Sequence, residues 1–356
     1  MKKIAIACGG TGGHINPAIA VAEALRAQRH ELTLIVSGQR EADRRAVANW
    51  SGVSLCSGAM PMRHVVRNLI AILRCRAFLK KTRPELLFTT GGYTSFAPVV
   101  AARWLGIPVV MHEANSVAGE AVVFLSRYLK IEAVALSFAE TAAQLPWVKT
   151  ELTGLPLRAS VLAELEKARA LPKEEETFTI FVTGGSQGAH GMNLLVAPIL
   201  ASFARAQPTV RIVHQCGVAD MEAMREIYKE VLPHVELCAF IDSIGFFYGR
   251  AEVVIARAGA ATCFELAQCA VPTLFIPLPT AKDDHQTKNA EALVRQGGAI
   301  VFHQRTVRPE QIAEVLGLLY ADPTLLTAMH EALAALPLSD ATAKVAALLV
   351  RTEASL

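Results

Sequence analysis

The feature that most constrains this chain of 356 residues is a glycine-rich segment that occurs twice. One copy is IACGGTGGH at residues 6–14, and the other is FVTGGSQGAH at residues 181–190. In both, an apolar run ends in glycines and leads into a stretch with helical spacing. Backbone N–H groups therefore gather at a helix N-terminus, where a phosphate or diphosphate can be held. Glycine is needed because a Cβ atom would block the approach of such a ligand. The repetition predicts two domains of similar architecture.

Short apolar runs alternate with amphipathic stretches along the chain. Apolar runs of this length are typical of buried parallel strands, and the stretches between them are typical of connecting helices. We therefore predict an α/β protein in which each half is a doubly wound, Rossmann-like parallel sheet. The strands are expected at residues 2–8, 31–37, 85–90, 107–113, 177–183, 210–216, 235–240, 251–257 and 272–278.

The domain boundary is expected in the charged segment 159–178, which contains Pro172 and connects the halves. A final helix is expected near the C-terminus, with Ser339 or Asp340 as its N-cap. The predicted parts are an N-terminal domain of residues 1–158, a C-terminal domain of residues 159–338, and a helix within 339–356 that packs back on the first domain.

The composition excludes several classes of protein. A net charge of +3 gives no overall basis for binding nucleic acid. The seven cysteines form no CxxC pair and no cluster with histidines, so we expect no metal site, no disulfides and a reducing cytoplasm. The N-terminal apolar run breaks into glycines without a cleavage site, and no run reaches the ~20 apolar residues of a membrane span. We expect a soluble protein that can still contact a membrane surface.

The two glycine segments admit other interpretations. The glycines can serve only a tight turn and close helix packing, with no ligand bound. The first segment lacks the third glycine of a dinucleotide fingerprint, and neither contains the Lys-Ser/Thr of a P-loop. GGSQG also fits the G-x-S-x-G nucleophile elbow, which makes a serine hydrolase built on Ser186 an alternative. The first segment has no matching nucleophile, so the hydrolase interpretation leaves it unexplained.

A third strand-to-helix turn, VVIARAGAATCFELA, points to a nucleotide. Its helix N-terminus, near Gly259 and Thr262, suits a diphosphate, and Glu265 is placed to accept hydrogen bonds from the two hydroxyls of a ribose. Glu265 can also be an ordinary helix-dipole carboxylate. The following segment PTAKDDHQTKNAEAL offers Gln286 and Asn289, whose amides supply the donors and acceptors that a sugar ring needs.

Eight ordered motifs resemble one family over nearly the entire chain. They are GGTGGHINPAIAVAEAL, GGYTSFAP, HEANSVAG, TGLPLR, GGSQGAHGMN, FIDSI, RAGAATCFELA and DDHQTKNA. They are similar to the MurG family, the UDP-N-acetylglucosamine–lipid I transferases of bacterial peptidoglycan synthesis. The resemblance implies a GT-B fold, with two Rossmann-like domains facing across a cleft, and an inverting transfer that needs no tightly bound metal or other cofactor. A related UDP-sugar transferase with a different lipid or glycoside acceptor, and a nucleotide-binding scaffold without activity, remain alternatives.

The resemblance also implies site residues. Those for the donor UDP-N-acetylglucosamine are Thr11, Gly12, Gly13, Asn115, Arg158, Ser186, Gln187, Ile241, Arg257, Gly259, Ala261, Thr262, Glu265, Gln286 and Asn289. Those for the acceptor lipid I are Gly10, His14, Tyr93 and Glu113. Two positions depart from the family pattern, because Ala114 stands where the family has glutamine and Leu155 where it has asparagine. Both departures affect expected contacts near the cleft rather than the reaction class.

In the implied reaction, the C4 hydroxyl of the acceptor's N-acetylmuramyl sugar displaces UDP from the anomeric carbon. Helix N-termini and an arginine can stabilise the departing diphosphate without a metal. His14 is our candidate general base, because an imidazole ordinarily titrates near pH ~6.5. A purely loop-ordering role for His14 is the alternative, and Glu113 is the competing base. The first glycine segment is expected to face the acceptor's own diphosphate.

The segment MRHVVRNLIAILRCRAFLKKTRP is expected to contact the membrane that holds lipid I. Basic residues recur on one helical stripe with apolar neighbours, which is typical of an interfacial helix on anionic lipid. A crossover helix with a solvated basic face is the alternative. The stripe consists of Arg63, Arg67, Arg74 and Lys81, flanked by Ile70 and Phe78. We expect a peripheral enzyme on the cytoplasmic side of the inner membrane, with cell-wall synthesis and division proteins as possible partners.

Overall fold

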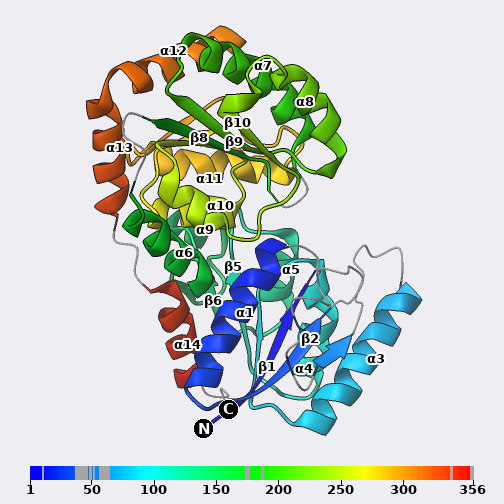
Figure 1. Cartoon of the computed structure of the whole chain (residues 1–356). Coiled ribbons are helices and arrows are strands. Elements are labelled where there is room, and N and C mark those ends of the chain that lie inside the picture. Colours follow the sequence, from blue (N-terminus) through cyan, green and yellow to red (C-terminus); the bar gives the residue numbers. More distant parts are fainter. Residues whose placement is uncertain are drawn as a thin grey trace. The chain divides into compact units, whose positions relative to one another are not determined.

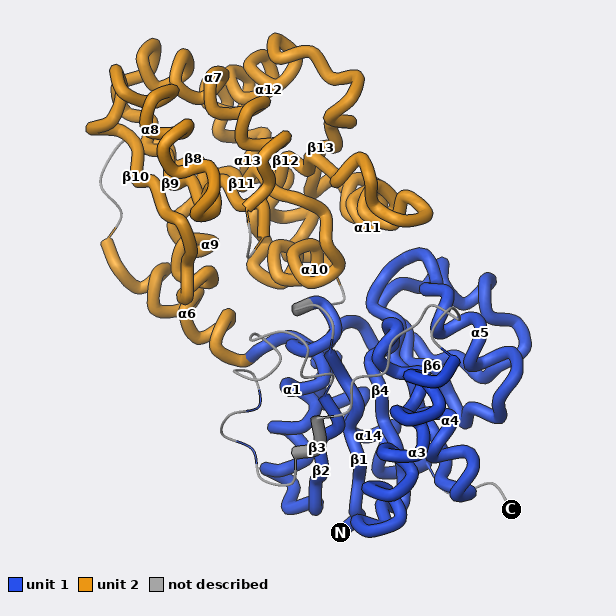
Figure 2. The backbone as a smooth tube through the Cα atoms, turned by 90° about the vertical axis from the view of Figure 1, so that its right-hand side faces the viewer, with its two compact units in different colours: residues 1–158, 338–356 blue, residues 159–337 orange. Residues whose placement is uncertain are grey.

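The computed structural model describes residues 1–9, 12–36, 47, 50, 53–55, 65–172, 177–185, 188–336 and 340–352. The chain divides into two compact units, coloured separately in Figure 2. The first unit contains residues 1–158 together with 338–356, and the second contains residues 159–337. Each unit is built on its own parallel sheet.

The first unit contains a seven-stranded sheet in the order β3-β2-β1-β4-β5-β6-β7, with every neighbouring pair parallel. Its strands are β1 (Lys3–Cys8), β2 (Glu31–Val36), β3 (Val53–Leu55), β4 (Leu86–Thr89), β5 (Val109–Glu113), β6 (Ala133–Leu136) and β7 (Thr150–Leu152). Its helices are α1 (Gly12–Ala27), α3 (Val65–Thr82), α4 (Phe96–Trp104), α5 (Glu120–Tyr128) and α14 (Ala341–Arg351), with the 3₁₀ turns η2 (Tyr93–Ser95) and η3 (Ala139–Gln144).

The first sheet has helices on both of its faces (Figure 1). Alternate residues of β1 belong to opposite cores, because successive side chains of a strand point to opposite faces. Ala5 and Ala7 pack in the core formed with α3, α4 and α5, whereas Ile4 and Ile6 pack in the core formed with α1 and α14. A strand buried on both faces explains why β1 is read in the sequence as a continuous apolar run.

The C-terminal helix α14 packs against α1, although the two are far apart in sequence. Asp340 is its N-cap, and the carboxylate accepts a hydrogen bond from the backbone N–H of Ala343 at 2.9 Å. Asp340 is one of the two N-caps expected from the sequence, and the other, Ser339, lies outside the described residues. Val345 and Leu349 on the inner side of α14 are fully buried in this core.

The second unit contains a six-stranded parallel sheet in the order β10-β9-β8-β11-β12-β13. Its strands are β8 (Phe178–Thr183), β9 (Val210–Gln215), β10 (Val235–Cys238), β11 (Val253–Ala256), β12 (Thr273–Phe275) and β13 (Ala299–Val301). Its helices are α6 (Ala159–Ala170), α7 (His190–Ala206), α8 (Met221–Tyr228), α9 (Ile244–Arg250), α10 (Ala260–Gln268), α11 (His285–Val294), α12 (Pro309–Ala321) and α13 (Pro323–Ala334), with the 3₁₀ turns η4 (Val218–Asp220), η5 (Leu232–His234) and η6 (Lys282–Asp284).

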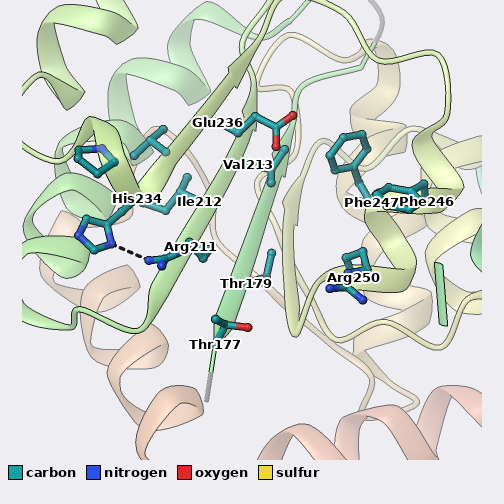
Figure 3. A pocket seen from close by; sticks show the side chains of 12 residues that line it. Thr177, Thr179, Arg211, Ile212, Val213, His234, Glu236, Phe246, Phe247 and Arg250 are labelled. Atoms are coloured by element: carbon teal, nitrogen blue, oxygen red, sulfur yellow. Dashed lines mark hydrogen bonds between the residues drawn. The ribbon is translucent and has the colours of Figure 1, made fainter. Parts of the chain in front are cut away.

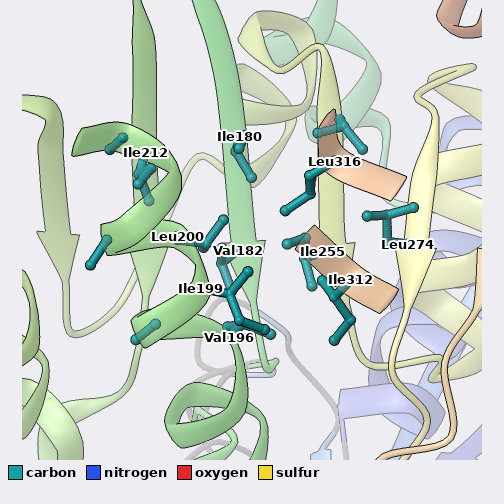
Figure 4. Close-up of a cluster of buried hydrophobic side chains, with 14 of the residues drawn as sticks. Ile180, Val182, Val196, Ile199, Leu200, Ile212, Ile255, Leu274, Ile312 and Leu316 are labelled. Atoms are coloured by element: carbon teal, nitrogen blue, oxygen red, sulfur yellow. The ribbon is translucent and has the colours of Figure 1, made fainter. Parts of the chain in front are cut away.

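The main core of the second unit lies between one face of its sheet and helices α7, α8 and α12 (Figure 4). Ile180 and Val182 of β8 meet Leu200 of α7 and Leu316 of α12 there, and all four side chains are fully buried. Phe181, which alternates with them on β8, packs on the other face against rings of α9. The second sheet is therefore also covered on both faces, as a doubly wound fold requires.

The segment expected as a connection begins with a true helix of the second unit. Helix α6 packs closely on α9, and two glycines of α9 make this approach possible. A Cβ atom built on Gly245 would lie 2.1 Å from the carbonyl oxygen of Val161, and one on Gly249 would lie 2.7 Å from the Cβ of Ala168. The charge pattern of α6 did not indicate this packing, because the contact depends on Gly245 and Gly249 of α9, which have no side chains.

All nine strands expected from the sequence are confirmed, as β1, β2, β4, β5 and β8 to β12. Four further strands of three or four residues, namely β3, β6, β7 and β13, were not predicted. Across the described ranges, no single helix is long and apolar enough to cross a membrane. The pair α12 and α13, bent by 94° at their junction, meets that test only jointly, by length and composition.

Candidate functional site

Both sheets place their glycine turns where ligands bind in doubly wound folds. Each sheet reverses its strand order at one point, between β1 and β4 in the first unit and between β8 and β11 in the second. Ligands of such sheets bind outside the carboxyl ends of the strands at this point. The first glycine segment follows β1, the second follows β8, and the turn before α10 follows β11. Each unit therefore has one candidate site at its switch point.

In the first unit, His14 is fixed to the turn that follows β4. Its Nδ1 donates a hydrogen bond to the carbonyl oxygen of Thr90 at 2.8 Å, and the hydroxyl of Thr90 donates to the carbonyl oxygen of His14 at 2.6 Å. Because a carbonyl oxygen only accepts, the Nδ1 proton is fixed and a neutral ring keeps the Nε2 lone pair. His14 is half-buried, so solvent can reach part of the side chain that carries Nε2. This geometry suits a general base.

The turn after β4 comes very close to the His14 ring. Gly92 has φ +75°, and a Cβ atom there would lie 3.0 Å from Nε2 and Cδ2 of His14. Tyr93 follows directly and is half-buried, so the structure brings these two predicted acceptor residues into one small region. The hydroxyl of Thr94 donates to the carbonyl oxygen of Gly9 at 3.2 Å and joins this turn to the first glycine segment.

Glu113 is surrounded by donors from its own loop. Its Oε1 accepts from the backbone N–H of Asn115 at 3.0 Å and from the Asn115 amide at 3.3 Å, and its Oε2 accepts from the backbone N–H of Gly119 at 2.8 Å. Gly119 is the N-cap of α5, so the carboxylate orders the loop and the start of that helix. Glu113 is also buried. These contacts favour a loop-ordering role over the proton-accepting role that stays a prediction for this residue.

A second histidine, His112, lies beneath this site and was not singled out in the sequence. Its Nε2 lies 3.2 Å from the carbonyl oxygen of Gly154 and 3.3 Å from the hydroxyl of Ser137, and its Nδ1 has no hydrogen-bond partner among the described residues. Burial lowers the pKa of His112 to about 4, with a smaller contribution in the same direction from the nearby His14, and the hydrogen bond to the backbone of Gly154 opposes this shift only in part. His112 is therefore neutral at physiological pH. The signal available in the sequence was a histidine that follows the apolar residues Val109, Val110 and Met111 within a buried strand.

In the second unit, Arg257 lies directly after β11 and is 7% exposed. Its Nη1 donates to the carbonyl oxygens of Ile276 at 2.8 Å and Pro277 at 2.9 Å, which joins the turn after β11 to the loop after β12. Its Nε has no hydrogen-bond partner in the described part of the chain. Burial lowers the pKa of Arg257 to about 10, so the guanidinium remains charged at neutral pH.

Three polar residues are predicted to bind the nucleotide sugar, and two of them are hydrogen-bonded to neighbouring loops. Asn289 is fully buried, and its amide donates to the carbonyl oxygen of Ala258 at 3.2 Å. The side-chain oxygen of Gln286 accepts a hydrogen bond from the backbone N–H of Leu278 at 2.9 Å. The NH₂ group of the same amide is the part that can donate. Glu265 is buried on α10, whose N-cap is Gly259. Contacts within the second unit therefore bring the starts of α10 and α11 together.

The histidine of the second glycine segment is used differently from its counterpart. His190 donates from Nδ1 to Asp220 at 2.7 Å, and Asp220 also accepts from the Asn193 amide at 2.7 Å. Nε2 of His214 donates to Asn193 at 3.1 Å, and the hydroxyl of Tyr228 donates to Nδ1 of His214 at 3.0 Å. Burial lowers the pKa of His214 to about 4, which keeps it neutral as these bonds require. The network is buried except for His190, which is exposed; it anchors the start of α7 and was missed in the sequence.

Other predicted residues are placed singly. Ile241 lies half-buried in the loop before α9, and Arg158 lies half-buried before α6. Ala114 and Leu155, the two departures from the family pattern, are both buried. Gly12 and Gly13 begin α1, and Ala261 and Thr262 form the first turn of α10. Predicted residues outside the described ranges are Gly10, Thr11, Arg63, Ser186 and Gln187.

Helix α3 has a buried side and an outer face. Asn68, Ala71, Cys75 and Leu79 are buried, and Phe78 is half-buried against the same core, which differs from the lipid-facing position expected for it. We define the α3 outer face by its exposed apolar residues, Val65, Val66, Leu69, Ile70 and Leu73, and by the exposed basic residues Arg67, Arg74 and Lys81. The three described members of the basic stripe are thus exposed, and Val65, Val66, Leu69 and Leu73 extend the apolar part beyond Ile70.

A pocket of about 360 Å³ lies on the face of the second sheet between β9, β10 and α9 (Figure 3). Arg211 and His234 line one side, joined by a hydrogen bond of 2.8 Å, and Phe246, Phe247 and Arg250 line the other. None of the predicted donor residues lines this pocket. It is therefore separate from the switch point and is not the candidate site.

Two doubly wound units, each with a glycine turn at its switch point, define the GT-B class of glycosyltransferases. The sequence matches two family models, the glycosyltransferase family 28 N-terminal domain over residues 4–134 and the glycosyltransferase family 28 C-terminal domain over residues 179–345. These matches cover most of the chain. The chain belongs to glycosyltransferase family 28.

Curated relatives agree with this assignment. A protein of Geobacter sulfurreducens is 35% identical over 342 residues, covering 93% of each chain, and one of Nitratidesulfovibrio vulgaris is 37% identical over 345 residues, covering 92% of each. Both carry the name UDP-N-acetylglucosamine–N-acetylmuramyl-(pentapeptide) pyrophosphoryl-undecaprenol N-acetylglucosamine transferase. The crystal structure of Acinetobacter baumannii MurG matches with a TM-score of 0.80 at 29% identity, covering 99% of this chain and all of that one.

A more distant structure shares only the fold. UDP-GlcNAc 2-epimerase from Neisseria meningitidis matches with a TM-score of 0.70 at 15% identity, covering 98% of this chain and all of that one. The family assignment makes the chain a glycosyltransferase, and it gives no support to the hydrolase alternative.

Proposed function

We propose that this enzyme transfers N-acetylglucosamine from UDP-N-acetylglucosamine to the C4 hydroxyl of the N-acetylmuramyl sugar of lipid I, giving lipid II for peptidoglycan synthesis. The names of the relatives support this choice of substrates. The observation that carries it is the glycine turn at the switch point of each sheet, because donor and acceptor each contain a diphosphate. Two diphosphate substrates account for both copies of the motif.

On the donor side, we assign the departing UDP to the carboxyl edge of the second sheet. The N-termini of α7 and α10 favour negative charge there. Arg257 supports this assignment independently. Its buried cation has no carboxylate partner among the described residues, which costs desolvation free energy, and a bound diphosphate would offset that cost. Glu265 is assigned to the ribose hydroxyls, Ile241 to the uracil, and Gln286 with Asn289 to the sugar.

On the acceptor side, His14 is assigned as the general base. Nε2 takes the C4 proton as the oxygen attacks the anomeric carbon, the bond from this carbon to the diphosphate oxygen breaks, and configuration inverts in one displacement. The carbonyl oxygen of Thr90 would stabilise the imidazolium that forms, because it already accepts from Nδ1. The first glycine segment and Tyr93 are assigned to the acceptor.

A donor panel tests the proposal. UDP release is measured with a lipid I analogue and with UDP-N-acetylglucosamine, UDP-N-acetylgalactosamine or UDP-glucose as donor. We expect acceptor-dependent release with the first donor and much slower release with the other two. UDP binding without turnover of any donor would indicate a scaffold, and labelling of Ser186 by a fluorophosphonate with loss of activity would indicate a hydrolase. Either result would refute the proposal.

We also propose that the α3 outer face docks on anionic lipid at the cytoplasmic side of the inner membrane. Lipid-linked acceptors are held in the bilayer, so the enzyme must approach its surface. The face combines exposed apolar side chains with a basic stripe, which is the composition of an interfacial helix. Arg67, Arg74 and Lys81 recur every seven residues along it, so they share one side of the helix.

A further inference from the structure

A buried tyrosine contacts the carboxylate that we assign to the ribose. Tyr248 lies on α9, and its hydroxyl donates to Oε2 of Glu265 on α10 at 3.4 Å. Tyr248 is 1% exposed, and Glu265 is also buried. The bond joins two helices with different expected tasks, because α9 follows the loop that carries Ile241 and α10 carries the ribose ligand.

The phenol is held in place by parts of the unit other than α10. Its ring packs against Phe181 of β8, with 5.8 Å between the ring centroids. Helix α9 is fixed against α6, because Gly245 and Gly249 allow close approach of the two helices. The hydroxyl of Tyr248 is therefore a donor whose position does not depend on the side chain that it contacts.

A glutamate needs such support to recognise a diol. Both carboxylate oxygens must face two adjacent hydroxyls at once, and a free glutamate side chain loses rotamer entropy when it adopts that orientation. A fixed donor behind the carboxylate selects this orientation before the ligand binds. We propose that Tyr248 is a positioning residue that orients Glu265 for the ribose of the donor nucleotide. This inference rests on the proposed function, which assigns the ribose to Glu265.

The length of the contact sets the expected effect. A distance of 3.4 Å is longer than an ordinary O–H···O bond, and such bonds in ligand sites often tighten when the substrate binds. We expect loss of the hydroxyl to weaken nucleotide recognition about three- to tenfold, which corresponds to about 0.6–1.4 kcal/mol.

The experiment compares UDP with 2′-deoxy-UDP, which lacks one ribose hydroxyl. Dissociation constants are measured by calorimetry for the parent and for Tyr248→Phe, which keeps the ring and removes the hydroxyl. We expect the preference for UDP to fall about three- to tenfold in the variant. The KM for UDP-N-acetylglucosamine should rise by a similar factor while kcat stays near the parent value, because the reacting atoms are untouched.

The matched control is Tyr320→Phe on α12. Its hydroxyl lies 2.8 Å from the hydroxyl of Thr209, so this variant also loses a tyrosine hydrogen bond in the same unit. Tyr320 packs against Phe178 and Phe203 in the core on the other face of the sheet. We expect its preference for UDP over 2′-deoxy-UDP to equal that of the parent. Equal weakening of both ligands in Tyr248→Phe would indicate a merely structural role and overturn the inference.

A third variant separates this inference from the proposed function. Glu265→Gln should abolish most of the preference for UDP, and adding Tyr248→Phe to it should change the preference no further. If Glu265→Gln keeps the parent preference, the ribose assignment itself is wrong. If Glu265→Gln loses the preference and Tyr248→Phe retains it, the ribose assignment stands and the positioning role of Tyr248 is refuted.

Discussion

Docking of the α3 outer face can be tested by removing its apolar centre. Leu69 is 51% exposed and Ile70 is 47% exposed, so about half of each side chain remains to be buried in lipid. Complete burial of such a side chain is worth about 1.5–3 kcal/mol, which leaves about 1 kcal/mol for each residue. The double variant Leu69→Ser/Ile70→Ser should lose about 2 kcal/mol, or about 30-fold in vesicle binding.

The assay is co-sedimentation with vesicles of phosphatidylcholine, with and without phosphatidylglycerol. The parent should prefer anionic vesicles and lose this preference at high salt, because each basic residue near the surface contributes about 1 kcal/mol that salt screens. The matched control is Leu318→Ser on α12, which replaces a leucine that is 55% exposed and has no basic stripe beside it. Thermal unfolding checks that both variants fold.

Two results would refute the docking proposal. One is binding of the double variant at the parent level. The other is an equal loss in Leu318→Ser, which would show that any exposed leucine matters and that the α3 outer face is not a specific surface. Binding of the parent that ignores both anionic lipid and salt would remove the role of Arg67, Arg74 and Lys81.

Other predictions concern catalysis, pH and packing. His14→Gln should lower kcat about 10²–10⁴-fold in steady-state assays while UDP binding is unchanged, and parent-level turnover would remove His14 from the chemistry. Burial holds the pKa of His112 and His214 near 4 instead of 6.5, so the unfolded chain binds protons that the folded chain does not. Stability is therefore lost as the pH falls from about 6.5 towards 4, by about 2 kcal/mol for each histidine at about pH 5, and urea unfolding at pH 7.5 and 5 that showed no difference would contradict this. Gly245→Ala should destabilise the second unit by about 1–3 kcal/mol, since the new Cβ would lie 2.1 Å from a carbonyl oxygen of α6. Gly317→Ala, where nothing lies within 4 Å, should instead stabilise α12 slightly in a thermal melt, and equal effects of the two variants would exclude the steric explanation.

The two copies of the glycine motif have diverged around a common turn. In the first unit the histidine after the glycines, His14, is hydrogen-bonded through Nδ1 to the backbone carbonyl of Thr90, which leaves the lone pair of a neutral ring on Nε2. In the second unit the corresponding His190 is paired with Asp220 and anchors α7. The first arrangement suits a base that must gain and lose a proton, and the second suits a fixed helix start beside a diphosphate.

The sequence predicted most of the interior strands and the edge strand β10, and it missed three edge strands and the interior strand β6. Central strands such as β1 and β8 are buried on both faces, so they appear as continuous apolar runs. The strands β3, β7 and β13 lie at sheet edges and have only three residues each, and β6 has four. Such short strands form because a neighbouring strand offers hydrogen bonds. Length alone does not separate them from β12, which also has three residues and was predicted.

Candidate site residues could be proposed from the sequence where they occur at strand-to-helix junctions. The glycine turns, Glu265 and the amides of α11 occur at strand-to-helix junctions, and those junctions are visible as patterns in the chain. The contacts that decide how such residues work join segments far apart in sequence. Thr90 lies 76 residues from His14, and the partner of Arg257 lies about twenty residues further along.

The amino-acid sequence by itself thus determined the fold class, the duplicated architecture and the places where a glycine segment follows a strand, because alternation of apolar runs and glycine segments is a local property. Only the tertiary structure decided that Glu113 is held by its own loop, that Phe78 packs into a core and that Tyr248 lies behind Glu265. Burial and hydrogen-bond partners depend on which elements pack together. That packing arises from the parallel pairing of strands that are distant in the chain.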